Sequence, residues 1–312
     1  MSGTAAATPQ SSLHAGSVQA ASFGELSAVL SVGAAALLLG VMLLLALSLG
    51  RARQVRVRLW LVGGGIALPV AVLTALFFYG ESRRPDWRPM PPADALVVTV
   101  TAHLWWWDIR YSDPRTGAEF VTANEVRLPV GRPVYFALAS GDVIHSFWVP
   151  ALGGKMDMVP GRLQHLLVQP TTEGRWRGQC AEYCGEQHAR MALDVLVVAP
   201  QAFERWSAAQ ARPASVAENH PGLQAFEKHR CSFCHRVRGV ADEASRGLGP
   251  DLTHVGGRLS LAAASLPNTP QNLRSWITHT QQLKAGARMP SGAGRVPDHE
   301  LEDIAAWLST LK

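Results

Sequence analysis

Residues 179–191 concentrate side chains that bind soft metal ions. Within twelve residues the segment offers two thiols, an imidazole and a thioether, from Cys180, Cys184, His188 and Met191. These ligand types select copper over magnesium or calcium. A mononuclear blue-copper site uses one cysteine. The second cysteine, four residues after the first, therefore predicts two metal ions that share two bridging sulfur atoms.

A site with two metal ions needs further ligands, and His145 lies upstream in the segment Asp142-Val-Ile-His145-Ser-Phe-Trp148. This histidine stands between a strand-like run and an apolar run, so it can present its imidazole from the edge of a sheet. A rigid β domain that holds ligands from two separate strands keeps the metal geometry fixed, which favours fast electron transfer. Bound thiols must lose their protons, so assembly of the site would release protons.

Two alternatives exist for this loop: a disulfide between its cysteines, or a zinc site of two cysteines and two histidines. Neither alternative accounts for Met191, Glu182 and the upstream His145 together. Copper ligation by the whole set is therefore the interpretation that we adopt from the residues.

The second pair of cysteines forms the motif Cys231-x-x-Cys234-His235, the attachment signature of c-type haem. The two thiols would form thioethers with the haem vinyl groups, and His235 would bind the iron as proximal ligand. A redox dithiol or a zinc pair is the alternative. A thioredoxin-type motif, however, occurs within a βαβ pattern, which this part of the sequence lacks.

A low-spin haem that carries electrons needs a sixth ligand on the opposite side of the iron. Met289 is the only methionine after Met191, and its separation of 54 residues from His235 lets the chain wrap the haem. Ligation by methionine and histidine raises the reduction potential. His254 and His279 are the competing ligands.

The composition predicts a membrane protein with a soluble part, since 47% of the 312 residues are hydrophobic and 17% are charged. Residues 26–50 and 59–80 carry no charged side chain over 25 and 22 positions. About 20 apolar residues span the hydrocarbon core as a helix, so both segments are predicted to cross the membrane. A buried core hairpin is the alternative. Residues 1–22 are expected to form a flexible tail.

The distribution of arginine predicts the topology. The positive-inside rule places the loop between the two segments in the cytoplasm, because this loop is arginine-rich and the tail carries no Lys or Arg. Both termini would then lie on the periplasmic side of a bacterial inner membrane. Three arginines after the second segment oppose this topology, but the exported domain that follows outweighs them. The loop arginines are Arg51, Arg53, Arg56 and Arg58, and the opposing ones are Arg83, Arg84 and Arg88.

The soluble part divides into two predicted domains. Residues 85–210 begin with a proline-rich spacer and continue as short runs of period two between turn signals, which predicts a β-sandwich or barrel closed by a short helix at residues 201–210. Residues 211–221 form a linker that contains two prolines. Residues 222–312 show helical spacing and predict an all-α domain whose last helix is capped by Asp298.

The copper-loop motif and four others resemble subunit II of the haem-copper cytochrome c oxidases over residues 23–206. That family has an exported cupredoxin domain with a binuclear copper centre, CuA. The resemblance implies that the two cysteines bridge both coppers, that each histidine binds one copper, and that the thioether and one backbone carbonyl bind one copper each. The residues concerned are His145, Cys180, Glu182 (carbonyl), Cys184, His188 and Met191. The supporting motifs are His103-Leu-Trp105-Trp-Trp107, Asp142-Val-Ile-His145-Ser-Phe, Pro150-Ala-Leu-Gly-Gly-Lys-Met-Asp157, Pro160-Gly-Arg162 and Cys180-x-Glu182-x-Cys184-Gly-x-x-His188-x-x-Met191.

The same resemblance implies two further roles. The Glu182 carboxylate would face a magnesium or manganese ion at the boundary with subunit I, because carboxylate oxygen suits a hard cation. Trp105 occupies a position where, in the family, an aromatic side chain near the copper receives electrons.

Residues 218–312 resemble class I cytochrome c. Besides the haem motif, the resemblance includes Gly249-Pro250-Asp251-Leu252, which in the family follows the haem-binding helix. It implies that the carbonyl of Pro250 accepts the proton of the His235 imidazole and thereby orients the proximal ligand.

Together the resemblances imply a multidomain membrane protein: two transmembrane helices, a cupredoxin domain and an all-α cytochrome c domain. Its partners would be subunit I, subunit III, membrane lipid and an external electron donor. Nucleic acid is not expected as a partner. Electrons would pass from the donor to the haem, to the copper pair and to subunit I, which holds the oxygen-reducing site. Because the cytochrome domain is attached to the copper domain, its effective concentration there is about millimolar. Electrostatic attraction between the two domains is then less necessary, so no acidic docking patch is expected.

Three alternatives remain open. They are the copper subunit of a nitric oxide reductase, a free-standing membrane-anchored electron carrier, and a copper chaperone. A chaperone site should be exposed and poor in ligands, and a haem would serve no purpose in metal delivery. A quinol oxidase subunit of the same fold lacks these copper ligands.

Overall fold

The computed structural model describes residues 10–50, 56–83, 90–215, 219–240 and 247–312. The chain forms two compact units, of which one is Ala21–Asp86 and the other combines Met1–Ala20 with Trp87–Lys312. The spacer and linker lie partly outside the described residues, at 84–89 and 216–218.

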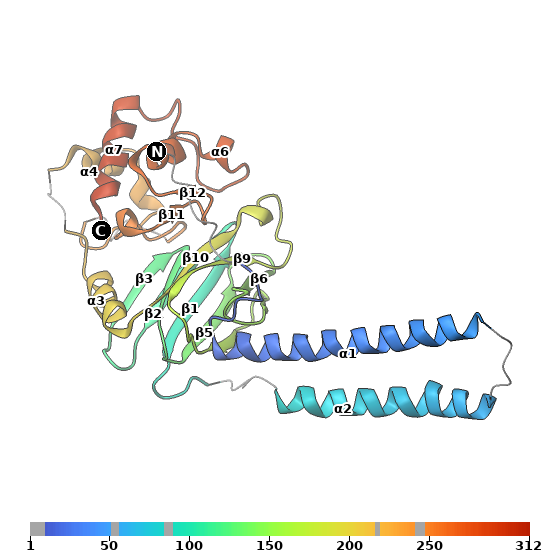
Figure 1. Ribbon diagram of the computed structural model, residues 1–312. Coiled ribbons are helices and arrows are strands. Elements are labelled where there is room, and N and C mark those ends of the chain that lie inside the picture. The colour runs from blue at the N-terminus through green and yellow to red at the C-terminus, as the bar shows by residue number, and fades with distance from the viewer. Residues whose placement is uncertain (1–9, 51–55, 84–89, 216–218, 241–246) are drawn as a thin grey trace, which may run out of the picture. The chain divides into compact units, whose positions relative to one another are not determined.

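Two long apolar helices supply the smaller unit, as the uncharged runs predict (Figure 1). Helix α1 (Val18–Ser48) has 31 residues, and the π-helix η1 (Leu59–Ala67) continues into α2 (Leu68–Ser82) to give 24 residues. Both helices are long and apolar enough to cross a membrane. Near one end of the pair, Glu25 of α1 accepts hydrogen bonds from Tyr79 and Arg83.

A flexible tail is expected over residues 1–22, of which residues 1–9 lie outside the described residues. The residues just before α1 differ from this expectation, because they bind to the β domain. Helix α1 already begins at Val18, and Ser17 is buried. The Gly16 N–H donates to the Ala151 carbonyl at 2.7 Å, and the Gly16 carbonyl accepts from the Thr171 N–H at 2.8 Å. Small residues leave no local pattern that predicts such long-range backbone pairing.

Ten strands build the cupredoxin sandwich from two five-stranded sheets, ordered β3-β2-β1-β5-β8 and β4-β10-β9-β6-β7 (Figure 1). Strands β1 and β5 pair in parallel, as do β4 and β10, and the other pairs are antiparallel. The strands are β1 (Leu96–His103), β2 (Trp106–Ser112), β3 (Glu119–Ala123), β4 (Glu125–Pro129), β5 (Val134–Ser140), β6 (His145–Trp148), β7 (Met156–Met158), β8 (Gln164–Val168), β9 (Gly174–Cys180) and β10 (Ala192–Val198).

The core of the sandwich explains why these segments become strands. Burial alternates along β1 at every second residue, so its inward side chains meet those of the opposite sheet. The edge of Trp107 packs against Phe147 with ring centroids 5.8 Å apart. Helix α3 (Pro200–Ala211) closes the domain, as predicted, and buries Phe203 against Tyr111.

Short helices form the cytochrome domain. An interruption at His279 separates α5 from α6. Asp298 is the first residue of α7 and not its cap, because Pro297 occupies the cap position. The elements are α4 (Pro221–Lys228), η3 (Cys231–Phe233), η4 (Val255–Gly257), β11 (Ser260–Leu261), β12 (Leu266–Pro267), α5 (Pro270–Thr278), α6 (Thr280–Leu283) and α7 (Asp298–Thr310).

A glycine permits the central helix crossing of this domain. Helices α4 and α7 pack so closely that a Cβ atom on Gly222 would lie 2.2 Å from the Asp303 carbonyl oxygen. Trp307 of α7 is completely buried and packs against Phe226 of α4. This crossing fixes the end of α4, from which the haem motif emerges.

Candidate metal and haem centres

The predicted copper ligands come from two neighbouring strands and the loop between β9 and β10. His145 begins β6, and Cys180 ends β9, which pairs with β6. The loop is closed at its base because the Cys180 N–H donates to the Met191 carbonyl at 2.8 Å. A short 3₁₀ turn, η2 (His188–Arg190), carries the loop back toward the sheet.

All six predicted ligand groups converge. The Sγ atom of Cys180 lies 3.7 Å from the Sγ of Cys184, 3.8 Å from Nδ1 of His145 and 3.1 Å from the Glu182 carbonyl. The Sγ of Cys184 lies 3.6 Å from Nδ1 of His188 and 3.9 Å from Sδ of Met191.

These separations fit metal ligation. Metal–sulfur bonds of about 2.3 Å at a tetrahedral angle place two ligand atoms about 3.8 Å apart. A disulfide requires about 2.05 Å between the sulfurs, and both cysteines are free thiols. Two shared thiolates, two imidazoles, a thioether and a carbonyl form a donor set suited to copper. The residues therefore fit the binuclear centre that their types predict.

Asp142 orients the histidine on the sheet side. Its carboxylate accepts a hydrogen bond from Nε2 of His145 at 2.8 Å and from the Leu104 N–H at 2.8 Å. With Nε2 as donor, Nδ1 keeps its lone pair for a metal ion. Burial opposes ionisation of Asp142, but the hydrogen bonds from His145, Val143 and Leu104 outweigh it and lower the pKa of this carboxyl. Sequence reasoning missed this role, although the spacing Asp142-x-x-His145 is its signal.

The two thiols are unequal in their acidity. Hydrogen bonding with the Cys184 sulfur lowers the pKa of Cys180. The same bond raises the pKa of Cys184, because the proton is shared between the two sulfurs.

Trp105 lies directly against the copper loop. Its indole N–H donates to the Cys184 carbonyl at 2.9 Å, and the side chain is 9% exposed. Gly185 has φ of +111°, and a Cβ atom there would lie 3.2 Å from the indole ring. Glycine thus allows the loop to approach the ring closely.

The side chain of Glu182 points away from the ligand cluster, in keeping with a role for its carbonyl at the copper. The carboxylate is 44% exposed and lies 3.7 Å from Nζ of Lys155, which also approaches Asp157 at 3.5 Å. The magnesium or manganese site at this carboxylate stays a prediction.

The haem motif follows α4 and forms the turn η3. His235 donates from Nδ1 to the Pro250 carbonyl at 2.8 Å, which matches the orientation that the resemblance implies and leaves Nε2 for iron. Gly249 permits this contact, since a Cβ atom there would lie 2.7 Å from the imidazole. Burial lowers the pKa of His235 and raises the pKa of Cys231 to about 11.

Met289 stays the predicted sixth ligand. It is half-buried against the core of the cytochrome domain, and its carbonyl accepts from the Gln281 amide at 2.7 Å. Of the competing histidines, His254 uses Nε2 to bond to the Arg212 carbonyl at 3.0 Å. The buried Nδ1 atoms of His254 and His279 both lack a hydrogen-bond partner among the described residues.

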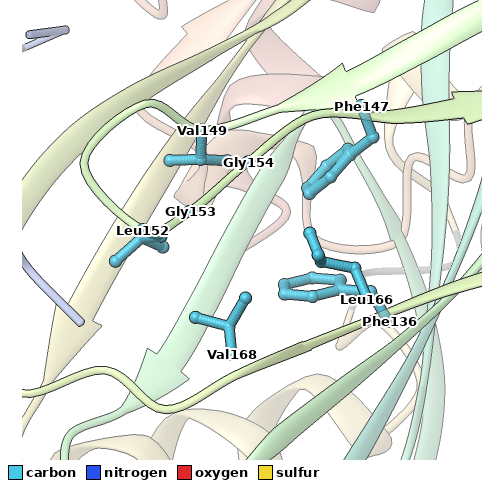
Figure 2. A pocket seen from close by; sticks show the side chains of 8 residues that line it. All are labelled: Phe136, Phe147, Val149, Leu152, Gly153, Gly154, Leu166 and Val168. Atoms are coloured by element: carbon cyan, nitrogen blue, oxygen red, sulfur yellow. The ribbon is translucent and has the colours of Figure 1, made fainter. Parts of the chain in front are cut away.

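An apolar hollow inside the sandwich is not a reaction site (Figure 2). Its lining is apolar and offers neither acids, bases nor nucleophiles. The residues around it are Phe136, Phe147, Val149, Leu152, Gly153, Gly154, Leu166 and Val168.

Soft ligands in a rigid sandwich and a haem-attachment motif in the adjoining domain define the class: an electron-transfer protein with apolar helices suited to a membrane anchor. Residues 118–198 match the family described as "Cytochrome C oxidase subunit II, periplasmic domain", and residues 220–312 match "Cytochrome c".

Relatives of known identity agree with these matches. Cytochrome c oxidase subunit 2 of Alkalihalophilus pseudofirmus is 35% identical over 251 residues, which cover 79% of this chain and 68% of the relative. The subunit 2 of Bacillus subtilis is 29% identical over 258 residues, covering 79% and 71%. The periplasmic domain of subunit II of the Bradyrhizobium japonicum oxidase is 32% identical, covers 38% of this chain and 95% of that structure, and has a TM-score of 0.35. The chain belongs to the cytochrome c oxidase subunit 2 family, and its C-terminal part is a cytochrome c domain.

Proposed function

We propose that this chain is the subunit through which electrons enter a terminal cytochrome c oxidase. An external donor would supply electrons to the haem on Cys231 and Cys234, and subunit I would receive them for the reduction of oxygen to water. The convergence of six copper-ligand groups at the end of a rigid sandwich carries the proposal. Two copper ions and one covalent haem would supply the one-electron chemistry.

The protein groups around the copper loop keep the ligands in place. His145, Cys180, Cys184, His188, Met191 and the Glu182 carbonyl would hold the two ions. Asp142 fixes the tautomer of His145, and strand pairing between β6 and β9 fixes the separation of His145 from Cys180. A site whose ligands are held by paired strands and hydrogen bonds needs little rearrangement when its charge changes.

The protein groups around the haem motif have a similar task. Cys231 and Cys234 would attach the porphyrin, and His235, oriented by Pro250, would bind the iron with Met289 on the other side. Trp105, in contact with the copper loop, would receive electrons on the way to copper.

The anchoring and the partners extend this proposal. Helices α1 and α2 would hold the chain beside subunit I in a bacterial inner membrane, with subunit III in the same complex. Both termini and both metal-carrying domains would lie on the periplasmic side. Glu182 would supply a carboxylate to a magnesium or manganese ion at the boundary with subunit I.

The test uses the purified oxidase complex and its Cys184→Ser variant. With a reductant that feeds the haem, the unaltered complex should consume oxygen, while the variant should keep a reducible haem and lose most oxygen consumption. Unimpaired oxygen consumption by the variant would contradict the proposal. Consumption of nitric oxide in place of oxygen, or copurification without a haem-bearing large subunit, would favour the reductase or the free carrier.

A further inference from the structure

A buried lysine joins the cytochrome domain to the copper domain. Lys284 follows α6 and is 3% exposed. Its Nζ donates to the backbone carbonyls of Trp105 at 2.9 Å, Arg190 at 2.9 Å and Ala262 at 3.0 Å. All three ammonium protons therefore have acceptors, and two of the acceptors belong to the copper domain. Burying an ammonium group is costly unless it is hydrogen-bonded, so Lys284 fits this position only while the domains are in contact.

The hairpin β11–β12 makes the second part of the contact. The Leu259 N–H donates to the Glu125 carboxylate at 2.7 Å, and the Ser260 hydroxyl donates to the Asp194 carboxylate. Both acidic side chains belong to the copper domain and are buried. The two carboxylates accept hydrogen bonds from neutral donors of the cytochrome domain. This buried contact differs from an exposed acidic patch, which attracts a cationic partner.

The turn of the hairpin is shaped for the same contact. Ala262, Ala263 and Ala264 all have positive φ, at 53°, 60° and 56°. The left-handed conformation is unfavourable for a residue with a Cβ atom. Here it presents three successive carbonyls to donors: Lys284, the Ala192 N–H at 3.3 Å and the Arg177 guanidinium at 3.3 Å. The hydrogen bonds across the contact offset the unfavourable conformation.

The contact places the loop that carries Met289 beside Trp105, the side chain that also contacts the copper loop. Lys284 precedes Met289, the predicted haem ligand, by five residues. Between them, Gly286 lies so close to Trp105 that a Cβ atom would be 3.3 Å from the indole ring. The other side of Trp105 donates to the Cys184 carbonyl. Hydrogen bonds therefore connect Lys284, in the segment that leads to Met289, through Trp105 to the carbonyl of the copper ligand Cys184.

We propose that Lys284 is a positioning residue that fastens the cytochrome domain to the copper loop and holds the Met289 loop against Trp105. In this docked arrangement an external protein cannot reach Trp105, so electrons reach the copper only through the attached haem. The inference rests on the proposed function for its electron path, but the docking itself depends only on residues of this chain.

Chemical labelling of the intact complex tests the docking without reference to metals. Amine acetylation followed by peptide mass spectrometry should leave Lys284 largely unmodified, while Lys228, with a side chain 63% exposed, should react rapidly. Lys284 labelling at the rate of Lys228 would overturn the proposal. Because this readout ignores copper and haem, it stays valid even if the proposed function fails.

A matched pair of variants tests the consequence for electron transfer. Lys284→Met keeps the length of the side chain and removes its donors, whereas Lys312→Met removes a charge from the exposed C-terminus of the same domain. Truncating one partner of a buried hydrogen-bonded charge weakens an association by at least about tenfold. Lys284→Met should therefore slow haem-to-copper transfer after flash reduction at least about tenfold, and Lys312→Met should not.

Further measurements distinguish a positioning role of Lys284 from damage to the haem or copper site in the variant. In Lys284→Met the haem reduction potential and the copper spectrum should be unchanged, and amide hydrogen exchange in residues 259–268 should accelerate. Unchanged transfer and exchange rates would overturn the proposal. Should the variant fail to fold, the labelling of the unaltered complex decides the question.

Discussion

The substitution Asp142→Asn tests how far a residue outside the ligand set controls copper binding. The carboxylate accepts one hydrogen bond from Nε2 of His145 and one from the Leu104 N–H, each at 2.8 Å. An asparagine side chain has a single carbonyl oxygen, so it can satisfy one of these donors well and must turn its NH₂ group toward the other. It also removes the negative charge that favours the Nε2–H tautomer of His145.

The expected magnitude follows from the loss of that partner. Removing the hydrogen-bond partner of a metal-bound histidine weakens metal affinity about 10- to 100-fold. This corresponds to about 1.4 to 2.8 kcal/mol of binding free energy. Competition between the protein and a copper chelator of known affinity measures the change, and the copper absorption spectrum reports whether both ions are still bound.

The matched control is Asp94→Asn in the same domain. Asp94 forms an exposed ion pair with Arg115, with side chains 59% and 53% exposed, so its removal should leave copper affinity unchanged. A copper affinity of Asp142→Asn within about twofold of the unaltered protein would refute the claim that Asp142 orients the ligand.

Three further predictions concern the cytochrome domain. Gly249→Ala should push the His235 ring off the Pro250 carbonyl, because the new Cβ atom would lie 2.7 Å from the imidazole, and should shift the haem reduction potential in a redox titration. Gly222→Ala should destabilise the domain by about 3 kcal/mol in denaturant unfolding, because overpacking at a backbone contact has no flexible side chain to displace. Hydrogen bonds from Lys228 and His229 lower the pKa of Glu300 to about 2. This value lies below the unfolded value of about 4.3, so the stabilisation is present above that pH and lost on acidification toward 2. Glu300→Gln should therefore lower the melting temperature at neutral pH, and by less near pH 3.

One control serves both glycine predictions. A Cβ atom on Gly257 would meet only the Lys312 Cα at 3.7 Å, an ordinary contact, so Gly257→Ala should leave both the potential and the stability unchanged. Equal effects at Gly257 and at the two predicted positions would contradict the packing argument. For Glu300, a variant whose melting temperature differs from that of the unaltered protein by the same amount at every pH would contradict the ionic origin of the effect.

The sequence predicted those features that depend on local patterns. Uncharged runs of sufficient length located α1 and α2, and the short runs of period two predicted the β-sandwich. The ligand loop was predictable because thiols, imidazole and thioether lie within twelve residues and define their own chemistry. His145 could be added because it stands between a strand-like run and an apolar run, where it can present its imidazole from the edge of a sheet.

The remaining features depend on contacts between distant segments. The binding of Gly16 to the sandwich involves its backbone groups, which leave no trace in residue type. Ser17 adds a hydrogen bond from its hydroxyl to the Leu152 carbonyl, a contact that a single serine in the sequence does not predict. Lys284 looks like any exposed lysine in the sequence, and its burial depends on three carbonyls from residues 22 to 179 positions away. Asp298 has the residue type of a cap, but Pro297 before it has the extended backbone conformation that the cap position needs.

The most direct test of the central claim is the metal content and electron paramagnetic resonance spectrum of the oxidised full-length protein. We expect two copper ions and one covalent haem per chain, with one unpaired electron shared equally between the two coppers. In Cys184→Ser the shared-electron signal should vanish while the haem signal persists. A single-copper spectrum, or a chain that binds no copper and forms a Cys180–Cys184 disulfide, would contradict the account.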